Sequence, residues 1–585
     1  MKKLLKYLSI YKKEAVLAPL FKMLEASFEL LVPLVMAEII DTGIKNQDMA
    51  FILKMGAVLV LLGAIGLACS LTAQYFAAKA AVGFGAGIRR DLFRHINRLS
   101  YSEIDTQGTA TLITRMTSDV NQVQSGVNLT LRLFLRSPFI VFGAMIMAFT
   151  IDVKSALIFV LAIPLLSAVV FGIMLLSMPL YKKVQRQLDG VMQITRENLS
   201  GARVIRAFNR EQDEAEAFKK EGGMLIRFQL FVGRISALLN PVTYVIVNLA
   251  IIILIYTGAV QVDSGRLSQG EVVALVNYMS QILVELIKLA NLIISITKAL
   301  ACAGRINRVF EMKSSIVDPG EQQREQEKSE EKAAVPGMPR VSFQNVSFSY
   351  QGSKEASLSH ISFDAAPGEM IGVIGGTGSG KSTLVNLIPR FYDVTEGQVL
   401  VDGTDVRAIP LSRLRGRIGV VPQKAVLFKG TIRDNMRWGK ENASDQEIGE
   451  ALETAQALEI VKTREEGLDT MIFQGGKNLS GGQRQRLTIA RALVRKPQIL
   501  ILDDSSSALD FATDARLRKA LRERAEGTTV FLVSQRASAL RYADQILVLD
   551  DGRLAGKGSH EELLKHCPVY REICQSQLSG EEAKQ

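Results

Sequence analysis

The chain has few of the residues that build metal centres and disulfide frameworks. It contains four cysteines and four histidines among 585 residues. Ordinary buried or free thiols are expected, because the cysteines show neither a metal-binding spacing nor a disulfide pattern. With only four histidines, metal chemistry is also not expected. The cysteines are Cys69, Cys302, Cys567 and Cys574.

Charge is unevenly distributed along the chain. The front half is strongly apolar, whereas the back half has the mixed composition of a soluble α/β domain, so one domain cannot account for this length. The formal net charge of +11 is compatible with a nucleic-acid partner, but much of the basic excess flanks apolar stretches, as at Lys2, Lys3, Lys6, Lys12 and Lys13. That pattern favours the cytoplasmic face of a membrane, and no nucleic acid is expected as a partner.

Six apolar stretches are each long enough to cross a bilayer, which takes about 20 residues. Basic residues gather in the long connections after the second and fourth stretches, whereas the other connections are short. By the positive-inside rule, both termini and the long loops are expected to be cytoplasmic. Met1 to Tyr11 is basic and amphipathic without a cleavage site, which favours an interfacial elbow helix over a signal peptide. The expected spans are Val16–Ile40, Phe51–Phe76, Leu133–Phe149, Ala156–Leu180, Ala237–Val260 and Val272–Ile294.

A phosphate-binding pattern stands in the back half. It fits GxxxxGK[ST] and lies between an apolar strand-like run and a helix-like run, as a P-loop requires. Its glycines let backbone N–H groups surround a phosphate, Lys381 adds a point charge and Ser382 offers a hydroxyl to Mg²⁺. A glycine-rich turn without a ligand is the alternative. The run comprises Gly375, Gly376, Thr377, Gly378, Ser379, Gly380, Lys381, Ser382 and Thr383.

A second motif weakens that alternative. About a hundred residues later comes Leu479 followed by Ser480, Gly481, Gly482 and Gln483, and then an apolar strand that ends in Asp503. Together with Tyr350, Gln423, the segment Ser507–Asp510 and Gln535, these motifs stand in the order found in ATP-binding cassette (ABC) proteins. Residues 339–577 therefore resemble an ABC cassette. The whole chain resembles a multidrug-type ABC exporter half-transporter: an α-helical transmembrane domain with six spans and long cytoplasmic extensions, followed by an α/β P-loop ATPase domain.

The resemblance implies ATP and Mg²⁺ as cofactors. It implies that Tyr350 stacks on adenine, although a buried strand tyrosine is the alternative. It further implies that Gln423 and Asp503 join Ser382 around Mg²⁺, and that the signature residues Ser480 to Gln483 reach the γ-phosphate held by a second cassette. One chain has one P-loop and one signature, so it must dimerise. Loop tips at Tyr101–Gln107 and Gly201–Asn209 are expected to dock on cassettes, the alternative being solvated hairpins.

Three departures from the family pattern are informative. The general base after Asp503 is usually glutamate, and here Asp504 is one methylene shorter; a misplacement of about an ångström can cost on the order of 100-fold in rate. Gln535 replaces the switch histidine and cannot carry a positive charge. Phe473–Gly476 also lacks the usual acidic and arginine residues. The expected catalytic set consists of Gln423, Asp504 and Gln535. An intact signature beside this weakened set resembles the degenerate-site subunit of heterodimeric bacterial exporters; a homodimer with two slow sites is the alternative.

Polar residues within the spans have two interpretations. Such groups are costly in lipid, so they are expected to face a cavity that forms a substrate path. The alternative is local pairing, Lys22 with Glu25 and Glu285 with Lys288. Because acids outnumber bases in this set, a modest preference for cationic amphiphiles is expected. The candidate cavity residues are Glu25, Glu29, Asn277, Gln281 and Glu285.

These expectations define a provisional organisation and function. The function expected is ATP-driven export of amphipathic small molecules, drug-like or lipid-like, across a bacterial-type cytoplasmic (inner) membrane, with a second half-transporter whose Walker B motif carries the usual glutamate. An ATP-gated membrane regulator or channel is the alternative, and the spans exclude a soluble cassette ATPase. The expected parts are an elbow helix (1–12), a transmembrane domain (13–312), a linker (313–338), a nucleotide-binding domain (339–577) and a polar tail (578–585).

Overall fold

The computed structural model describes residues 3–319, 337–353, 355–505, 507–524 and 527–582. Most of the expected linker at 313–338 and the last three residues of the expected tail lie outside this set. The chain forms two compact units, Met1–Asn97 with Ala110–Glu311, and Arg98–Thr109 with Met312–Gln585. We call them the helical unit and the cassette unit. The short segment Arg98–Thr109, expected in the transmembrane domain, therefore packs within the cassette unit.

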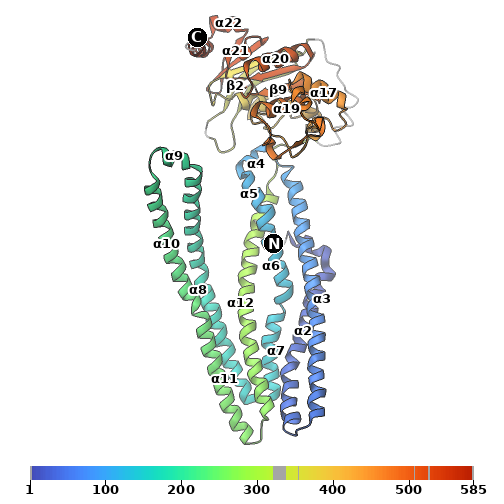
Figure 1. Ribbon diagram of the computed structural model, residues 1–585, viewed down its shortest axis with the longest axis vertical. Helices are drawn as coiled ribbons and strands as arrows, with labels where there is room; N and C mark the ends of the chain where they lie inside the picture. The colour runs from blue at the N-terminus through green and yellow to red at the C-terminus, as the bar shows by residue number, and fades with distance from the viewer. Residues whose placement is uncertain (1–2, 320–336, 354, 506, 525–526, 583–585) are drawn as a thin grey trace. The chain divides into compact units, whose positions relative to one another are not determined.

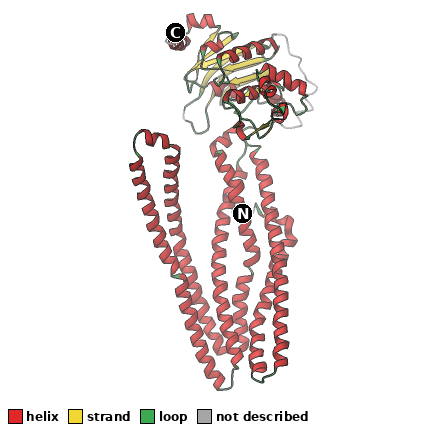
Figure 2. Cartoon of the chain, in the orientation of Figure 1, coloured by secondary structure: helices red, strands yellow, loops and turns green. Residues whose placement is uncertain are grey.

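The helical unit consists of long helices (Figures 1 and 2). Aspartate caps start two of the longest, since the side chains of Asp48 and Asp152 accept hydrogen bonds from the N–H groups of Phe51 and Ser155. In Figure 1, α8 and α10 run side by side up to α9. The helices are α1 (Leu5–Leu8), α2 (Lys12–Glu38), α3 (Met49–Ile96), α5 (Thr109–Thr114), α6 (Val120–Leu133), α7 (Arg136–Ile151), α8 (Val153–Ser200), α9 (Ala202–Ala207), α10 (Glu211–Ala237), α11 (Leu239–Asp263) and α12 (Gln269–Glu311).

Five helical segments in the described part of the chain are long and apolar enough to cross a membrane. They include the second to sixth expected spans. The first expected span lies in α2, which does not meet the same composition because Lys22, Glu25 and Glu29 lie in its middle. With 48 residues each, α3 and α8 extend about 70 Å at 1.5 Å per residue. Since the hydrocarbon core of a bilayer is about 30 Å thick, each of these helices is long enough to cross the core and to continue well outside it.

Close backbone approach and buried charge hold the extended parts of these helices together. Gly126 on α6 faces the side chain of Ala299 on α12 so closely that a Cβ at position 126 would overlap it. Nearby, the buried carboxylate of Asp119 accepts hydrogen bonds from Arg115 and from the guanidinium of Arg305 on α12. The α6–α12 contact is thus specified by a small residue and a paired charge.

The cassette unit is built on two sheets (Figure 2). A mixed six-stranded sheet has the order β12-β11-β3-β10-β9-β6; four of its five strand pairings are parallel, and the edge pairing β11–β12 is antiparallel. Its strands are β3 (Met370–Gly375), β6 (Ile418–Val421), β9 (Ile499–Asp503), β10 (Thr529–Val533), β11 (Gln545–Asp550) and β12 (Arg553–Gly558). An antiparallel sheet has the order β2-β1-β4-β5, from β1 (Val341–Phe348), β2 (Leu358–Ala365), β4 (Glu396–Val401) and β5 (Thr404–Asp405).

The central strands are apolar on both faces, as parallel strands covered on both sides must be. On β9, Leu500 and Leu502 join one hydrophobic core while Ile499 and Ile501 join the other, following the two-residue alternation of a strand. Helices cover these cores: α14 (Lys381–Leu387), α15 (Leu411–Gly416), α16 (Ile432–Arg437), α17 (Asp445–Thr454), α18 (Leu458–Lys462), α19 (Gly481–Leu493), α20 (Phe511–Arg524), α21 (Ala537–Leu540), α22 (His560–His566) and α23 (Pro568–Glu582). The expected polar tail therefore begins inside α23.

The first expected loop tip packs on the cassette. It forms α4 (Tyr101–Gln107), whose Tyr101 ring lies 4.7 Å from the ring of Phe391 between centroids. The hydroxyl of Tyr392 donates a hydrogen bond to the Asp105 carboxylate over 2.7 Å. Docking of Tyr101–Gln107 is thereby confirmed. The second tip, Gly201–Asn209, contains α9 and belongs to the helical unit, and its docking stays a prediction.

Candidate functional site

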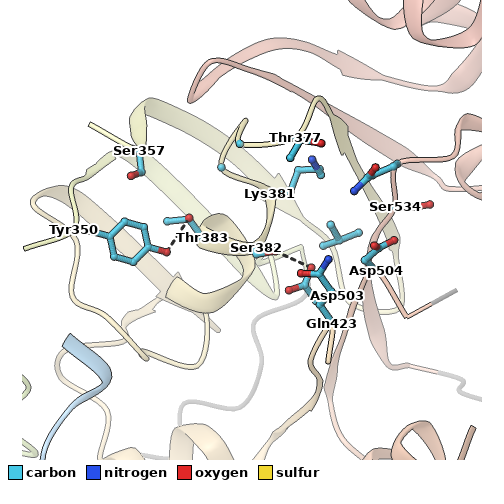
Figure 3. A pocket seen from close by; sticks show the side chains of 14 residues that line it. Tyr350, Ser357, Thr377, Lys381, Ser382, Thr383, Gln423, Asp503, Asp504 and Ser534 are labelled. Atoms are coloured by element: carbon cyan, nitrogen blue, oxygen red, sulfur yellow. Dashed lines mark hydrogen bonds between the residues drawn. The ribbon is translucent and has the colours of Figure 1, made fainter. Parts of the chain in front are cut away.

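A cavity of about 340 Å³ lies where the carboxyl ends of β3, β9 and β10 meet. Parallel strands bring residues that are distant in the sequence to this one edge of the sheet (Figure 3). The sequence-predicted residues that line it come from the P-loop, from the end of β9, and from the segments that follow β1, β6, β9 and β10. They are Tyr350, Thr377, Gly378, Gly380, Lys381, Ser382, Thr383, Gln423, Asp503, Asp504 and Gln535.

The P-loop runs from the end of β3 into α14. Gly380 has a φ of 92° and stands at the N-cap of α14, a left-handed position that glycine adopts without strain. Lys381 Nζ donates to the carbonyl oxygens of Gly375 and Gly376 at 2.9 and 2.5 Å. Burial lowers the pKa of Lys381, and the nearby Asp504 and Asp503 oppose that shift. The ammonium group is thus held at the mouth of a helix N-terminus, where an anion is favoured.

Two adjacent carboxylates face this cation. Ser382 Oγ donates to Asp503 Oδ1 at 3.0 Å, and Asp503 is 7% exposed. Burial raises the pKa of the Asp503 carboxyl, the bond from Ser382 opposes the rise and Asp504 adds to it. Burial also raises the pKa of Asp504, against a hydrogen bond from Gln423. The hydroxyl and carboxylates fit Mg²⁺, which proteins hold through one or two carboxylates while phosphate and water fill the other positions.

Asp504 has an unusual backbone conformation. Its φ is 45°, in the left-handed region, where aspartate is better tolerated than most other residues with a side chain. Its N–H donates to the carbonyl of Val533 at 3.1 Å, which ties the residue to β10. The short side chain therefore projects from a backbone that is hydrogen-bonded to the end of β10.

Tyr350 closes the other end of the cavity. Its hydroxyl lies 3.0 Å from Thr383 Oγ1, and its ring meets the rings of Phe348 and Tyr392 edge-on at 4.9 and 5.3 Å between centroids. The residue is 37% exposed. The alternative of a fully buried strand tyrosine is therefore wrong, and an accessible ring stands where a flat base could stack on it.

The signature residues lie elsewhere in the cassette unit. Ser480 caps α19: its side chain accepts from the N–H of Gln483, whose side chain accepts from the N–H of Ser480. Gly482 lies close to the backbone of the following loop, since a Cβ there would be 3.1 Å from the carbonyl oxygen of Ala508. Among the described residues that line the P-loop cavity, none belongs to the signature. The chain's own P-loop and signature thus do not share one site.

A second cavity, of about 440 Å³, lies in the helical unit between α2 and α12. Four of the five expected cavity residues line it: Glu29, Asn277, Gln281 and Glu285. The fifth, Glu25, instead pairs with Lys22 at 2.5 Å. Lys288 also pairs with Glu285, at 2.8 Å. The expected local pairing is therefore confirmed for both pairs, and Glu285 and Lys288 also line a cavity. Its use as a substrate path stays a prediction.

Sequence reasoning missed the centre of this charge cluster, Arg136 on α7. Its guanidinium donates to Glu285 at 2.7 Å and to Glu29 at 2.6 Å, and Ser137 donates to the second oxygen of Glu285. A charged residue inside the third expected span was the available signal. Arg136 brings the bases to three, with Lys22 and Lys288, against the acids Glu25, Glu29 and Glu285. The expected preference for cationic substrates therefore loses part of its argument, and it stays a prediction.

Comparisons with known proteins agree with this arrangement. Residues 16–286 match the family of the ABC transporter transmembrane region, and residues 358–507 match the ABC transporter family. The uncharacterized ABC transporter ATP-binding protein YfiB of Bacillus subtilis is 37% identical, covering 99% of each chain. An ATP-dependent lipid A-core flippase of Desulfotalea psychrophila is 35% identical over 82% of this chain and 83% of that protein. A solved structure of a bacterial Atm1-family ABC exporter with ATP bound aligns with a TM-score of 0.77 and 25% identity, covering 97% of this chain and 99% of that one.

The buried cluster predicts unequal costs for two similar substitutions. The Glu285 side chain is 4% exposed and that of Glu29 is 40% exposed. Glu285→Gln removes a buried charge from two cations and is expected to cost about 3 kcal/mol or more, whereas Glu29→Gln is expected to cost about 1 kcal/mol or less. Thermal unfolding of the two purified variants measures the difference. Equal losses of stability would contradict the central place given to Glu285.

Proposed function

We propose that this chain, which belongs to the ABC exporters, exports amphipathic small molecules as the degenerate-site half of a heterodimer. It is a half-transporter with fused transmembrane and ATP-binding domains, and its ATPase is coupled to transport. ABC exporters act as dimers in a membrane. The observation that carries the proposal is the aspartate that follows Asp503 in the P-loop cavity: Asp504 is one methylene shorter than the usual glutamate, and its backbone N–H donates to the carbonyl of Val533 at the end of β10.

Residue roles follow from the geometry of the P-loop cavity. Lys381 would contact the β- and γ-phosphates, and Ser382, Asp503 and Gln423 would surround Mg²⁺. Tyr350 would stack on adenine. Asp504 would orient water, but from about an ångström too far away, and Gln535 would donate a hydrogen bond without adding a charge. ATP would bind at this site and be hydrolysed slowly.

The separation of P-loop and signature supports assembly with another chain. Ser480 to Gln483 form the N-cap and first turn of α19 and lie outside the residues that line the chain's own P-loop cavity. They would complete the site of a partner whose Walker B motif carries glutamate, and fast hydrolysis would occur there. A homodimer would instead contain two slow sites. We also propose that the second loop tip, Gly201–Asn209, docks on a cassette.

The cavity between α2 and α12 supports the substrate class. It combines apolar walls, including Val32, Pro33 and Met36, with a balanced group of charges around Arg136. Such a lining suits amphipathic molecules, drug-like or lipid-like. The bacterial inner membrane, with both termini on the cytoplasmic side, is the proposed location. A regulator or channel gated by ATP would be distinguished by the absence of uphill substrate movement in vesicles that contain both subunits.

The assembly proposal predicts the ATPase rate of the chain alone. Purified by itself, the chain is expected to hydrolyse ATP slowly, because each site of a homodimer would rely on Asp504. Co-purification with a half-transporter that carries the Walker B glutamate is expected to raise the rate by on the order of 100-fold. Steady-state phosphate release from both preparations in lipid nanodiscs is the measurement. Rapid turnover by the chain alone would refute the heterodimer.

The proposal also predicts a gain of function. Asp504→Glu restores the missing methylene and is expected to raise hydrolysis at this site by up to about 100-fold, and adding Gln535→His is expected to raise it further. Asp503→Asn, which weakens the Mg²⁺ site, serves as the negative control. Unchanged thermal stability of Asp504→Glu shows that the left-handed backbone tolerates glutamate. An unchanged rate in that folded variant would mean that the length of the carboxylate is not limiting.

A further inference from the structure

The loop that carries Gln535 is attached to the C-terminal helix by one side chain. Gln577 on α23 donates from Nε2 to the carbonyl oxygen of Gln535 at 2.7 Å. The same amide accepts from the N–H of Ala537 through Oε1 at 2.8 Å. The two bonds bracket Arg536, so the backbone from 535 to 537 is held in one geometry as it would be by a neighbouring strand.

Gln577 reaches this loop because α23 is anchored in the core. Tyr570 and Cys574 are 0% and 6% exposed within the main hydrophobic cluster of the cassette unit. Gln577 follows them at three- and seven-residue spacings, which places it on the same face of the helix. The Tyr570 hydroxyl also lies 2.7 Å from His560 Nδ1 on α22. The helix that carries Gln577 is therefore anchored by core packing that does not depend on its contact with the loop.

The loop that Gln577 bonds to, residues 535–537, begins at the phosphate end of the cavity. Val533 on β10 pairs in register with Val373 on β3 and with Asp503 on β9. Two residues later, Gln535 lines the cavity together with Lys381 and Asp504. Its carbonyl oxygen is the atom that Gln577 holds. A change at Gln577 would therefore move a side chain at the phosphate end while Tyr350, at the other end, stays in place.

We propose that Gln577 is a positioning residue for the nucleotide site: it fixes the 535–537 backbone so that Gln535 meets the terminal phosphate of ATP. The C-terminal helix thereby sets how strongly the cassette distinguishes ATP from ADP. The inference rests on the cavity being the ATP site, and it does not depend on whether this site is degenerate, because it concerns binding and not the rate of hydrolysis.

Nucleotide affinity tests the proposal in the full-length chain. Gln577→Leu removes both hydrogen bonds at similar volume and is expected to weaken ATP binding about fivefold, the effect of one hydrogen bond of ordinary net strength. ADP binding is expected to stay unchanged. Ser576→Ala is the matched control, because in the described part of the chain the Ser576 hydroxyl donates to the carbonyl of Ile573 in its own helix; it is expected to alter neither affinity. Displacement of a fluorescent nucleotide by ATP or by ADP gives both values.

Two further measurements separate positioning from a general loss of structure. In a Gln535→Ala background, Gln577→Leu is expected to cause no additional loss of ATP affinity, since its effect passes through that side chain. Hydrogen exchange of the Ala537 amide is expected to accelerate about fivefold in Gln577→Leu. Gln577→Glu keeps the acceptor for the Ala537 N–H but loses the donor to the Gln535 carbonyl. This variant is expected to retain slow exchange of the Ala537 amide while losing the preference for ATP over ADP. It replaces Gln577→Leu if that variant does not fold. Equal weakening of ATP and ADP binding, or an undiminished loss in the Gln535→Ala background, would overturn the proposal.

Discussion

The nucleotide site depends on one buried cation and two neighbouring carboxyl groups, whose charged forms are each disfavoured by burial. Lys381 and the N-terminus of α14 face Asp503 and Asp504 at the edge of one parallel sheet, and burial shifts the pKa of Lys381 downward and those of both carboxyls upward. A phosphate chain with a divalent cation would stabilise all of these charged groups, because the phosphates would bind at the helix N-terminus beside Lys381 and the cation would bind to the carboxylates. The register of β3, β9 and β10 is what brings these groups together.

Contacts around this site connect it to other parts of the cassette unit. The Tyr392 hydroxyl donates to Asp105 on α4, and the Tyr392 ring meets the ring of Tyr350 edge-on. Thus the docked loop tip lies one aromatic ring away from the proposed adenine platform. At the phosphate end, Gln577 connects α23 to the loop of Gln535. Both ends of the cavity are therefore supported by segments that the P-loop and signature motifs do not include.

The sequence was sufficient for the features whose chemistry is local. The P-loop glycines, Ser382 and the apolar strand before Asp503 are each recognisable within a few residues, and their order predicted the cassette. Arg136 was not found because its partner Glu285 is 149 positions away, and the count of charges within the spans omitted it as a result. Gln577 was not predicted because a side-chain amide that bonds to a distant backbone leaves no pattern in the sequence. The composition of α2 differed from that of the other spans for a reason visible in the structure: Lys22 pairs with Glu25 inside the bundle.

The central claim is that the P-loop of this chain holds ATP in a slow site while a partner's site turns over with the help of Ser480 to Gln483. The most direct test is to trap nucleotide in the complex with its partner during turnover, label it covalently and locate it on each chain. The account predicts slowly exchanging ATP beside Lys381 of this chain and rapid exchange, with ADP, on the partner's P-loop. Equal exchange and equal ADP content at both sites would show that Asp504 is a competent base and would contradict the account.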